Sequence, residues 1–250
     1  MSGRCRVWGL MSDYVVQLQP AFVLHGKNYR ETSVIVDLLT RDFGRLSLLA
    51  KGVRKNRSRT AGLLQPFVPL LISYQGKAEL KTLTHVEMAP PAIILQGMSL
   101  YCGLYVNELV EAFLHQHDPH PEVFDDFHRC LRDLSTDESF DRILRGFEVR
   151  LLEHTGYGLQ LQQEADRDAA IRADLRYRYT PGLGAQVQAD GAFSGETLIA
   201  LRSGKLDTDL VRKEAKRLLR SVLDYHLPGR PLKSRQLFAQ LLKSQRQTTC

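Results

Sequence analysis

The sequence is poor in cysteine and lacks the short motifs that mark most enzyme sites. Its cysteines, Cys5, Cys102, Cys130 and Cys250, form no C-x-x-C pair, which argues against a zinc knuckle or redox site and favours reduced thiols in a cytosolic protein. There is no G-x-x-x-x-G-K-[ST], G-x-S-x-G or H-E-x-x-H motif, and no tight acidic cluster that would suit a two-metal nuclease. We therefore expect a protein that is not an enzyme, with no catalytic residues, no metal and no other cofactor.

Long apolar runs are missing as well. No stretch approaches the length of a membrane span, so we expect no membrane association. Only residues 8–11 follow the basic residues near the N-terminus, and they are too few for the core of a signal peptide. We therefore expect a cytoplasmic protein. Residues 1–12 have no pattern and are expected to form a disordered extension, in which Met11 is an equally good start.

Acidic residues are absent from residues 43–78, although the whole chain is only moderately basic, at +6. The basic residues of this stretch are Arg45, Lys51, Arg54, Lys55, Arg57, Arg59 and Lys77. Its centre, residues 50–60, has no hydrophobic period and lies between two β-like runs, so its charges must stay in water. Such a loop is either plainly solvated or binds a polyanion, and we predict that it binds nucleic acid.

Short β-like runs separated by turns fill residues 13–86. The expected strands are residues 14–24, residues 33–40, residues 45–50, a run that starts at Phe67, and residues 79–85. Pro69 in the fourth run suggests an edge strand or a bulge. Turns are expected at residues 26–30 and 42–44. Five such strands fit the OB-fold, a small and nearly closed barrel. Phe22, Tyr29, Phe67 and Tyr74 could stack on unpaired bases, but for each of them a place in the barrel core is the favoured interpretation.

The hydrophobic period changes to about 3.6 beyond the barrel, so residues 87–250 are expected to form a mainly helical domain with an irregular or β insertion around 160–193. Ser99 and Thr136 are expected to cap two of the helices, and the Gly156-Tyr157-Gly158 turn is expected to end one. The predicted fold class is therefore α+β, an N-terminal five-stranded OB-fold barrel followed by a mainly α-helical domain.

A second basic stripe follows the expected helix at 209–225. Arg212, Lys216 and Arg220 recur at i, i+4 and i+8. The full set of candidate nucleic-acid contacts in this half is Arg212, Lys213, Lys216, Arg217, Arg220, Lys233 and Arg235. Because the acidic residues of the helix come early, an ordinary helix whose charges suit its dipole explains the stripe equally well, and both interpretations stay open.

Three histidines lie close together in residues 115–120. They sit at a helix end and across a proline, with no Cys or Glu nearby in a ligand pattern, so a solvated loop is favoured over a metal site.

The chain resembles the RecO family of bacterial recombination mediators. The similarity covers nearly everything after Met11, with the segments in the expected order and spacing. The residues that carry it are Ala21–His25, Tyr29–Ser33, Gly44–Leu46, Ala50–Gly52, Gly62–Phe67, Glu79–Leu83, Leu104–Leu109, Phe147-Glu148, His154–Gly158 and Pro231–Arg235.

This resemblance implies a protein that binds single- and double-stranded DNA and anneals complementary strands coated with single-strand-binding protein (SSB). It also implies cooperation with RecR in loading RecA, a location in the cytoplasm with the nucleoid, and no cofactor. Many relatives carry two C-x-x-C pairs as a zinc site after the Gly-Tyr-Gly turn. Residues 159–179 contain no cysteine here, so no zinc is expected.

The family also binds the acidic C-terminal tail of SSB, which ends in a Phe carboxylate. Such a peptide needs an apolar pocket beside a cation. The arginine of the family's Leu-Arg-x-Phe-Glu pattern falls on Arg145, and Arg142 lies one turn away; both are expected on the helix face opposite the core. A general RNA-binding OB-fold protein is the main alternative, and an unrecognised phosphodiesterase is a third.

Overall fold

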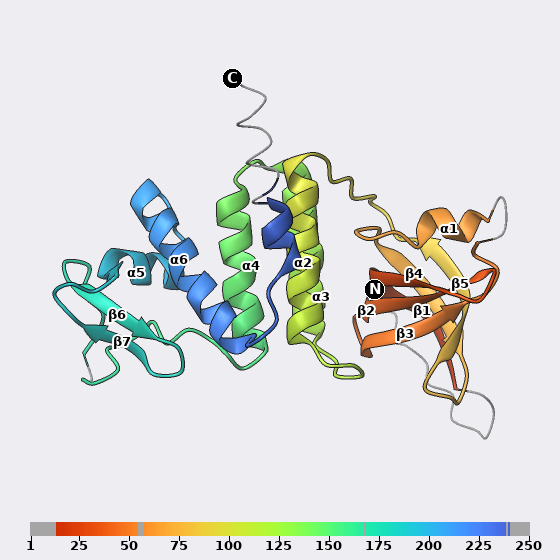
Figure 1. Ribbon diagram of the computed structural model, residues 1–250, viewed down its shortest axis with the longest axis horizontal. Coiled ribbons are helices and arrows are strands. Elements are labelled where there is room, and N and C mark those ends of the chain that lie inside the picture. The colour runs from red at the N-terminus through yellow and green to blue at the C-terminus, as the bar shows by residue number, and fades with distance from the viewer. Residues whose placement is uncertain (1–13, 55–57, 168, 239, 241–250) are drawn as a thin grey trace, which may run out of the picture. The chain divides into compact units, whose positions relative to one another are not determined.

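The computed structural model describes residues 14–54, 58–167, 169–238 and 240, which form two compact units (Figure 1). The first unit contains the described residues up to Leu95 together with Leu114–Leu131, and the second contains Gln96–Phe113 and the described residues from Arg132 onward. The expected N-terminal extension, Lys55 and Arg57 lie outside the described residues.

The first unit is a closed five-stranded barrel. Its elements are β1 (Val15–Tyr29), β2 (Ser33–Thr40), β3 (Gly44–Ala50), a short helix α1 (Arg59–Leu63), β4 (Leu70–Gln75) and β5 (Lys81–Met88). The strands pair in the order β1-β2-β3-β5-β4 and the barrel closes from β4 to β1; β3 and β5 are parallel, and the other pairs are antiparallel. This is the OB-fold that the strand pattern predicts.

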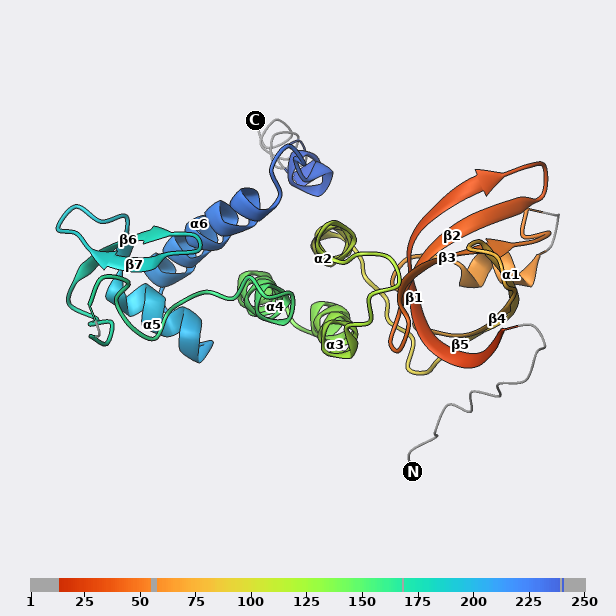
Figure 2. The same cartoon turned by 90° about the horizontal axis from the view of Figure 1, so that it is seen from below.

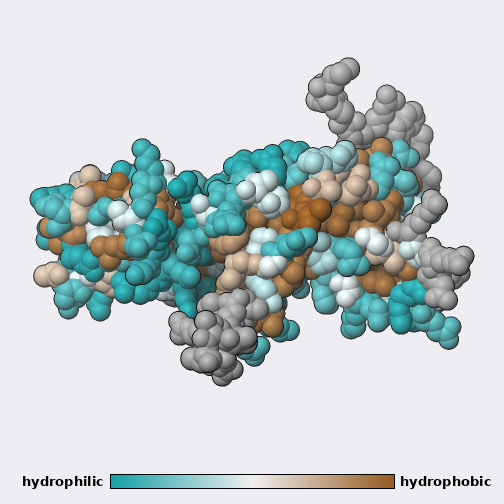
Figure 3. Space-filling view, turned by 90° about the horizontal axis from the view of Figure 1, so that it is seen from above, coloured by the Kyte–Doolittle hydropathy of each residue, from teal (hydrophilic) through white to brown (hydrophobic). Residues whose placement is uncertain are grey.

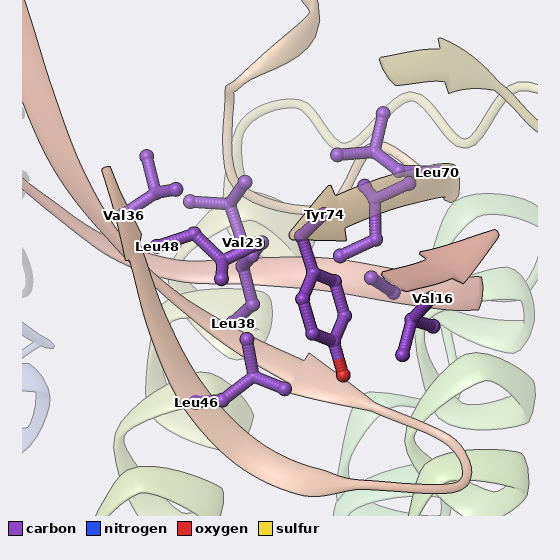
Figure 4. Close-up of a cluster of buried hydrophobic side chains, with 10 residues drawn as sticks. Val16, Val23, Val36, Leu38, Leu46, Leu48, Leu70 and Tyr74 are labelled. Atoms are coloured by element: carbon purple, nitrogen blue, oxygen red, sulfur yellow. The ribbon is translucent and has the colours of Figure 1, made fainter. Parts of the chain in front are cut away.

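Alternating side chains fill the barrel. Along β3, every second residue from Gly44 to Ala50 is buried, so the strand turns one face inward. Figure 4 shows the ring of Tyr74 standing among Leu38, Leu46 and Val16 inside the barrel. The closed barrel therefore presents a rigid outer surface from which loop residues project.

Three details of the barrel differ from the expectations. β1 runs through Pro20 and on to Tyr29, because residues 26–29 pair with β2 as an exposed ribbon that reads in sequence as a polar turn. The expected loop contains α1, which at five residues is too short to show a helical period. β4 begins only at Leu70, because Pro69 has no backbone N–H to donate to a neighbouring strand, although its carbonyl oxygen accepts a hydrogen bond from Ala89.

The start of α3 (Pro121–Thr136) belongs to the barrel unit. Phe124 and Phe127 pack on Phe22, with ring centroids 5.4 and 5.2 Å apart. The Arg41 guanidinium donates to both carboxylate oxygens of Asp125, at 3.1 and 3.0 Å. Contacts thus assign residues 114–131 to the barrel, although they lie beyond the sequence boundary at residue 86.

The second unit is mainly helical. It contains α2 (Met98–Phe113), α4 (Phe140–His154), α5 (Gly195–Ser203), α6 (Asp209–His226) and a sheet of order β7-β6-β8, formed by β6 (Arg176–Thr180), β7 (Gly184–Val187) and β8 (Phe193–Ser194). A last helix starts at residue 233, where the Glu108 carboxylate accepts from the backbone N–H groups of Lys233 and Ser234. Figure 2 shows α5 and α6 beside the β6–β7 hairpin. No helix in the described part of the chain is both long and apolar enough to cross a membrane.

Neither expected helix cap is observed. Thr136 is the last residue of α3, where its hydroxyl donates to the carbonyl oxygens of Arg132 and Asp133, and α4 starts only at Phe140 after Ser139. Ser99 lies inside α2, one residue after the helix begins. In contrast, Gly156, at φ +83°, follows the end of α4 as predicted.

Candidate nucleic-acid interface

The first part of the basic loop is held to the barrel while its charges face solvent. Lys51 and Arg54 are exposed in the turn after β3, and Val53 between them is buried. The Arg54 backbone N–H donates to the Thr32 carbonyl oxygen at 2.9 Å, and the Arg54 side chain donates to the Arg30 carbonyl oxygen at 3.2 Å. Two predicted DNA-binding cations therefore project from an anchored turn.

The structure describes the side chains of only some of the other basic residues in this stretch. Lys77 is exposed in the turn between β4 and β5. The backbone of Arg59 starts α1, but its side chain is outside the description, as are Lys55 and Arg57. A DNA contact by these residues stays a prediction.

Arg45, another predicted DNA contact, is mostly buried and paired within the barrel unit, and its contact with DNA stays a prediction. Its side chain is 11% exposed and forms an ion pair with Asp37 at 2.8 Å, and it donates to the Leu114 carbonyl oxygen at 2.8 Å. The backbone N–H of His117 donates to the Arg45 carbonyl oxygen. No local pattern at position 45 shows that the Arg45 side chain meets Leu114, which lies 69 positions further along the chain.

The basic stripe on α6 divides into two groups. The Arg212 side chain donates to the carbonyl oxygens of Leu206 and Asp207 and pairs with Asp209, and Arg217 donates to the Ala192 carbonyl oxygen. These two arginines therefore support the structural interpretation of the stripe.

The remaining cations of α6 keep more of their charge in water. Lys213 is exposed. Lys216 and Arg220 have side chains 65% and 68% exposed, and each has one loose ion pair, to Asp141 at 3.5 Å and Asp224 at 3.8 Å. Lys233 is also exposed, while Arg235 is mostly covered and pairs with Asp224. Fewer basic side chains of this helix and the segment after it are therefore available to a polyanion than the basic stripe in the sequence predicts.

Lys216, Arg220 and Arg235 also line a cavity of 260 Å³ in the second unit. The other lining residues are Tyr105 of α2, Asp141, Leu144, Arg145 and Glu148 of α4, and Phe238 of the last helix. Arg145 is 5% exposed, so the expectation that it lies on an outward face is wrong. The expectation assumed one buried face on α4, but α2 and α6 both contact this helix and cover a second face. Arg142 is exposed and is not a lining residue.

A buried polar network forms the floor of this cavity. Glu148 Oε1 accepts from Arg145 Nη2 at 2.5 Å and from the Tyr105 hydroxyl at 2.7 Å. Burial raises the pKa of the Tyr105 hydroxyl, and the neighbouring Glu148 charge raises it further. The hydroxyl therefore stays protonated and acts as a hydrogen-bond donor. Arg235 lies over the Tyr105 ring, 5.8 Å from its centroid. Among the described residues, Arg145 Nε and Arg235 Nη2 are buried nitrogen donors that have no hydrogen-bond partner.

Comparison with known proteins connects both units to one family. Residues 11–91 match the family model of the N-terminal part of Recombination protein O, and residues 96–236 match that of its C-terminal part. A DNA repair protein RecO from Methylococcus capsulatus is 46% identical over 225 residues, which cover 89% of this chain and 93% of the relative. Proteins of the same name from Halorhodospira halophila and Haemophilus influenzae are 41% and 40% identical, over 90% of this chain and 97% and 96% of each relative.

The chain belongs to the RecO family.

In this RecO chain, residues 159–179 contain no cysteine and include a buried hydrogen-bonded contact. The buried Tyr177 hydroxyl donates to Glu164 at 3.2 Å and accepts from the Arg172 backbone N–H at 2.9 Å. Among the described residues, no three His, Cys, Asp or Glu side chains are grouped as metal ligands. Residues 115–119 form an exposed loop, as expected.

The core interpretation of the barrel aromatics is confirmed for Tyr74, which belongs to the buried cluster inside RecO's barrel. Phe22 and Phe67 are also buried, but Phe22 packs against Phe124 and Phe127 of α3 instead. Tyr29 is half-buried, with the Arg30 guanidinium 5.3 Å from its ring centroid. Sequence reasoning missed the residues that complete the cavity around Arg145. Tyr105, Glu148 and Phe238 come from three separate helices, and no local pattern connects them.

Proposed function

We propose that this RecO family member is a non-enzymatic recombination mediator in DNA repair. It binds single- and double-stranded DNA, anneals complementary strands coated with SSB, and helps RecR to load RecA. The observation that carries the proposal is family membership over both units, with relatives that are named DNA repair proteins. The role places the protein in the cytoplasm with the nucleoid and requires no cofactor.

Annealing needs charge neutralisation rather than a catalytic group. Two DNA strands repel each other through their phosphates, and cations that bind phosphates release counterions and lower this repulsion. Lys51, Arg54 and Lys77 supply exposed charge on the OB-fold barrel, and Lys213, Lys216 and Arg220 do so on α6. Base pairing between the strands then supplies the driving force.

The test is annealing of two complementary SSB-coated oligonucleotides. A variant with Arg54, Lys55, Arg57 and Arg59 changed to alanine is compared with a control that loses four exposed cations of the second unit, Arg178, Arg202, Lys205 and Arg230. We expect the first variant to lose annealing and the control to keep it, with both folded by circular dichroism. If about five phosphates are neutralised, the salt slope for single strands is about −3.5 in wild type and flatter in the loop variant.

Wild-type protein that never anneals coated strands contradicts the mediator role. Tighter binding to RNA than to DNA of the same sequence then favours the RNA-binding alternative, because the 2′-hydroxyl is the group that differs. If both variants anneal the strands equally well, the DNA contact lies on α6 rather than on the basic loop.

We also propose that the cavity around Arg145 binds the SSB tail. The rings of Tyr105 and Phe238 and the Leu144 side chain offer apolar surface to a terminal phenylalanine, while the guanidinium groups of Arg145 and Arg235 line the same cavity and can pair with its carboxylate. Lys216 and Arg220 at the rim suit the acidic residues that precede it. Arg142, the second predicted contact, lies outside the cavity and is retained only as a control.

Binding of a fluorescent tail peptide tests this site. Lys216→Ala with Arg220→Ala removes rim charge from exposed positions and is expected to weaken binding by about tenfold, since charge-assisted contacts are worth about 1.5–3 kcal/mol when they are well desolvated and less at a rim. Arg142→Ala, at an exposed position of α4 that does not line the cavity, is expected to bind normally. A peptide that ends in a carboxamide should bind weakly to wild type; equal binding of the acid and the amide contradicts carboxylate recognition.

A further inference from the structure

A second groove lies on the barrel unit, apart from the basic loop. Its volume is 530 Å³, within the range of about 300–1,000 Å³ that is usual for small-ligand pockets. Tyr14 and Phe43 line it together with Asp42, Lys77, Lys81 and His117. Tyr74, one of the predicted base-stacking candidates, also lines the groove but is buried, whereas Tyr14 and Phe43 were not predicted.

The aromatic part of the groove is supported from the barrel core. The Tyr14 ring lies 6.4 Å from Phe43 and 6.5 Å from Tyr74, between centroids, and Phe43 meets Tyr74 edge-on at 6.2 Å. Tyr74 is buried and Phe43 packs against the core cluster, whereas Tyr14 is 43% exposed. Tyr14 therefore keeps much of its surface in water although its position is held by two packed rings.

The charges around the groove favour an anion. Lys81, the first residue of β5, has its Nζ 5.9 Å from the centroid of the Tyr14 ring, and Lys77 is exposed in the turn before this strand. Asp42 is the one acid among the described residues that line the groove, and it pairs with Arg41 at 3.5 Å. Two lysines thus stand beside an exposed ring with little opposing charge. Figure 3 shows hydrophobic and hydrophilic residues side by side on one face of the molecule.

The far wall of the groove is fixed in place. His117 donates its backbone N–H to the Arg45 carbonyl oxygen at 2.8 Å, which ties the loop to β3. Gly44 has φ +65°, and a Cβ atom there would lie 2.2 Å from the Asp118 carbonyl oxygen, so the loop packs directly on the backbone. The groove is therefore a pre-formed feature of the barrel rather than a gap between movable side chains.

We propose that this groove binds one unpaired base of single-stranded DNA, stacked on Tyr14, with a neighbouring phosphate held by Lys77 and Lys81. The inference rests on the proposed DNA-binding function and specifies one site for it. An aromatic face accepts any base, so the site has little sequence preference. A paired base is already stacked within the duplex and does not enter the groove, so the site distinguishes single strands from double strands.

The experiment uses a short single-stranded oligonucleotide that contains 2-aminopurine, whose fluorescence changes when it stacks. Wild type is compared with Tyr14→Ala, with Tyr14→Phe, which keeps the ring, and with Tyr225→Ala, which removes a tyrosine exposed on α6. We expect Tyr14→Ala to lower single-strand affinity by about tenfold and to abolish the 2-aminopurine change, because stacking on one base contributes this much. Tyr14→Phe and Tyr225→Ala should behave as wild type, and duplex affinity should be unchanged in all four proteins.

Two results overturn the stacking site while the proposed function stands. In the first, Tyr14→Ala binds single strands and changes 2-aminopurine fluorescence as wild type does. In the second, Tyr14→Ala loses single-strand and duplex affinity equally, which identifies a general effect on the barrel. Wild type that binds no single-stranded DNA overturns both the site and the proposed function.

Discussion

Glu214 on α6 offers the sharpest test of the forces that hold the second unit together. Its side chain is 6% exposed, and Arg176 donates to Oε1 at 2.9 Å. The other oxygen, Oε2, accepts from the Ser194 backbone N–H at 2.7 Å and from the hydroxyls of Ser194 and Thr197 at 2.8 Å. One carboxylate therefore joins β6, β8, α5 and α6, and α6 carries two cations of the proposed tail site.

The pKa of Glu214 gives the size of the effect. Burial alone would raise this pKa, but the hydrogen bonds from Ser194, Thr197 and Arg176 outweigh burial and lower it from 4.5 to about 2. A tenfold change in an ionisation constant corresponds to about 1.4 kcal/mol, so the charged carboxylate contributes about 3 kcal/mol to the stability of the unit at pH 7. Because the folded-state pKa is depressed, this contribution is complete above about pH 4.5 and is lost as the pH falls towards 2.

The Glu214→Gln variant tests this value in urea unfolding followed by circular dichroism, whose helical signal comes mainly from the second unit. We expect it to be less stable than wild type by about 3 kcal/mol at pH 7 and by about 1 kcal/mol at pH 3. Glu196→Gln, the same change at an exposed position of α5, should cost less than about 1 kcal/mol. If the Glu214→Gln variant is less stable than wild type by the same amount at pH 7 and at pH 3, this reasoning is refuted.

Three further predictions concern single positions. Gly44→Ala places a Cβ atom against the Asp118 carbonyl oxygen at positive φ, so the barrel unit should lose about 2 kcal/mol or more in chemical denaturation; unchanged stability would show that the loop yields easily. Thr208→Ala removes the side-chain cap of α6 and should lower stability by about 1 kcal/mol, whereas Thr208→Ser should not. Burial raises the pKa of the Cys102 thiol to about 11, so this residue should resist alkylation at pH 8 until the protein is unfolded, as peptide mapping can show.

The barrel was predictable because its signals are local. Alternation along β2 and β3 reports a strand with one buried face, and the Asp42-Phe43-Gly44 turn joins two strands that are neighbours in sequence. The closing β1–β4 and β3–β5 pairs are long-range and were inferred only from the number of strands. α1 and the extension of β1 to Tyr29 were missed, since one is too short and the other too polar to leave a period.

The candidate sites were only partly predictable. A run of cations without acids is visible in any sequence, and Lys51 and Arg54 are indeed exposed. Whether a given cation is available depends on its distant partners, which is why Arg45, Arg145 and Arg212 are tied to other groups of the chain despite their place in basic or surface patterns.

The sequence by itself determined the class of fold, the absence of familiar catalytic motifs and the location of the densest positive charge. These properties follow from hydrophobic periodicity, sequence motifs and local composition, which can be read from residues that are neighbours in the sequence. Tertiary structure decided which charged side chains pair with other groups of the protein and which face solvent. It also assembled the cavity around Arg145 and the groove beside Tyr14 from residues of separate elements. Side-chain contacts depend on distances that folding creates between remote segments, and no local pattern in the chain encodes them.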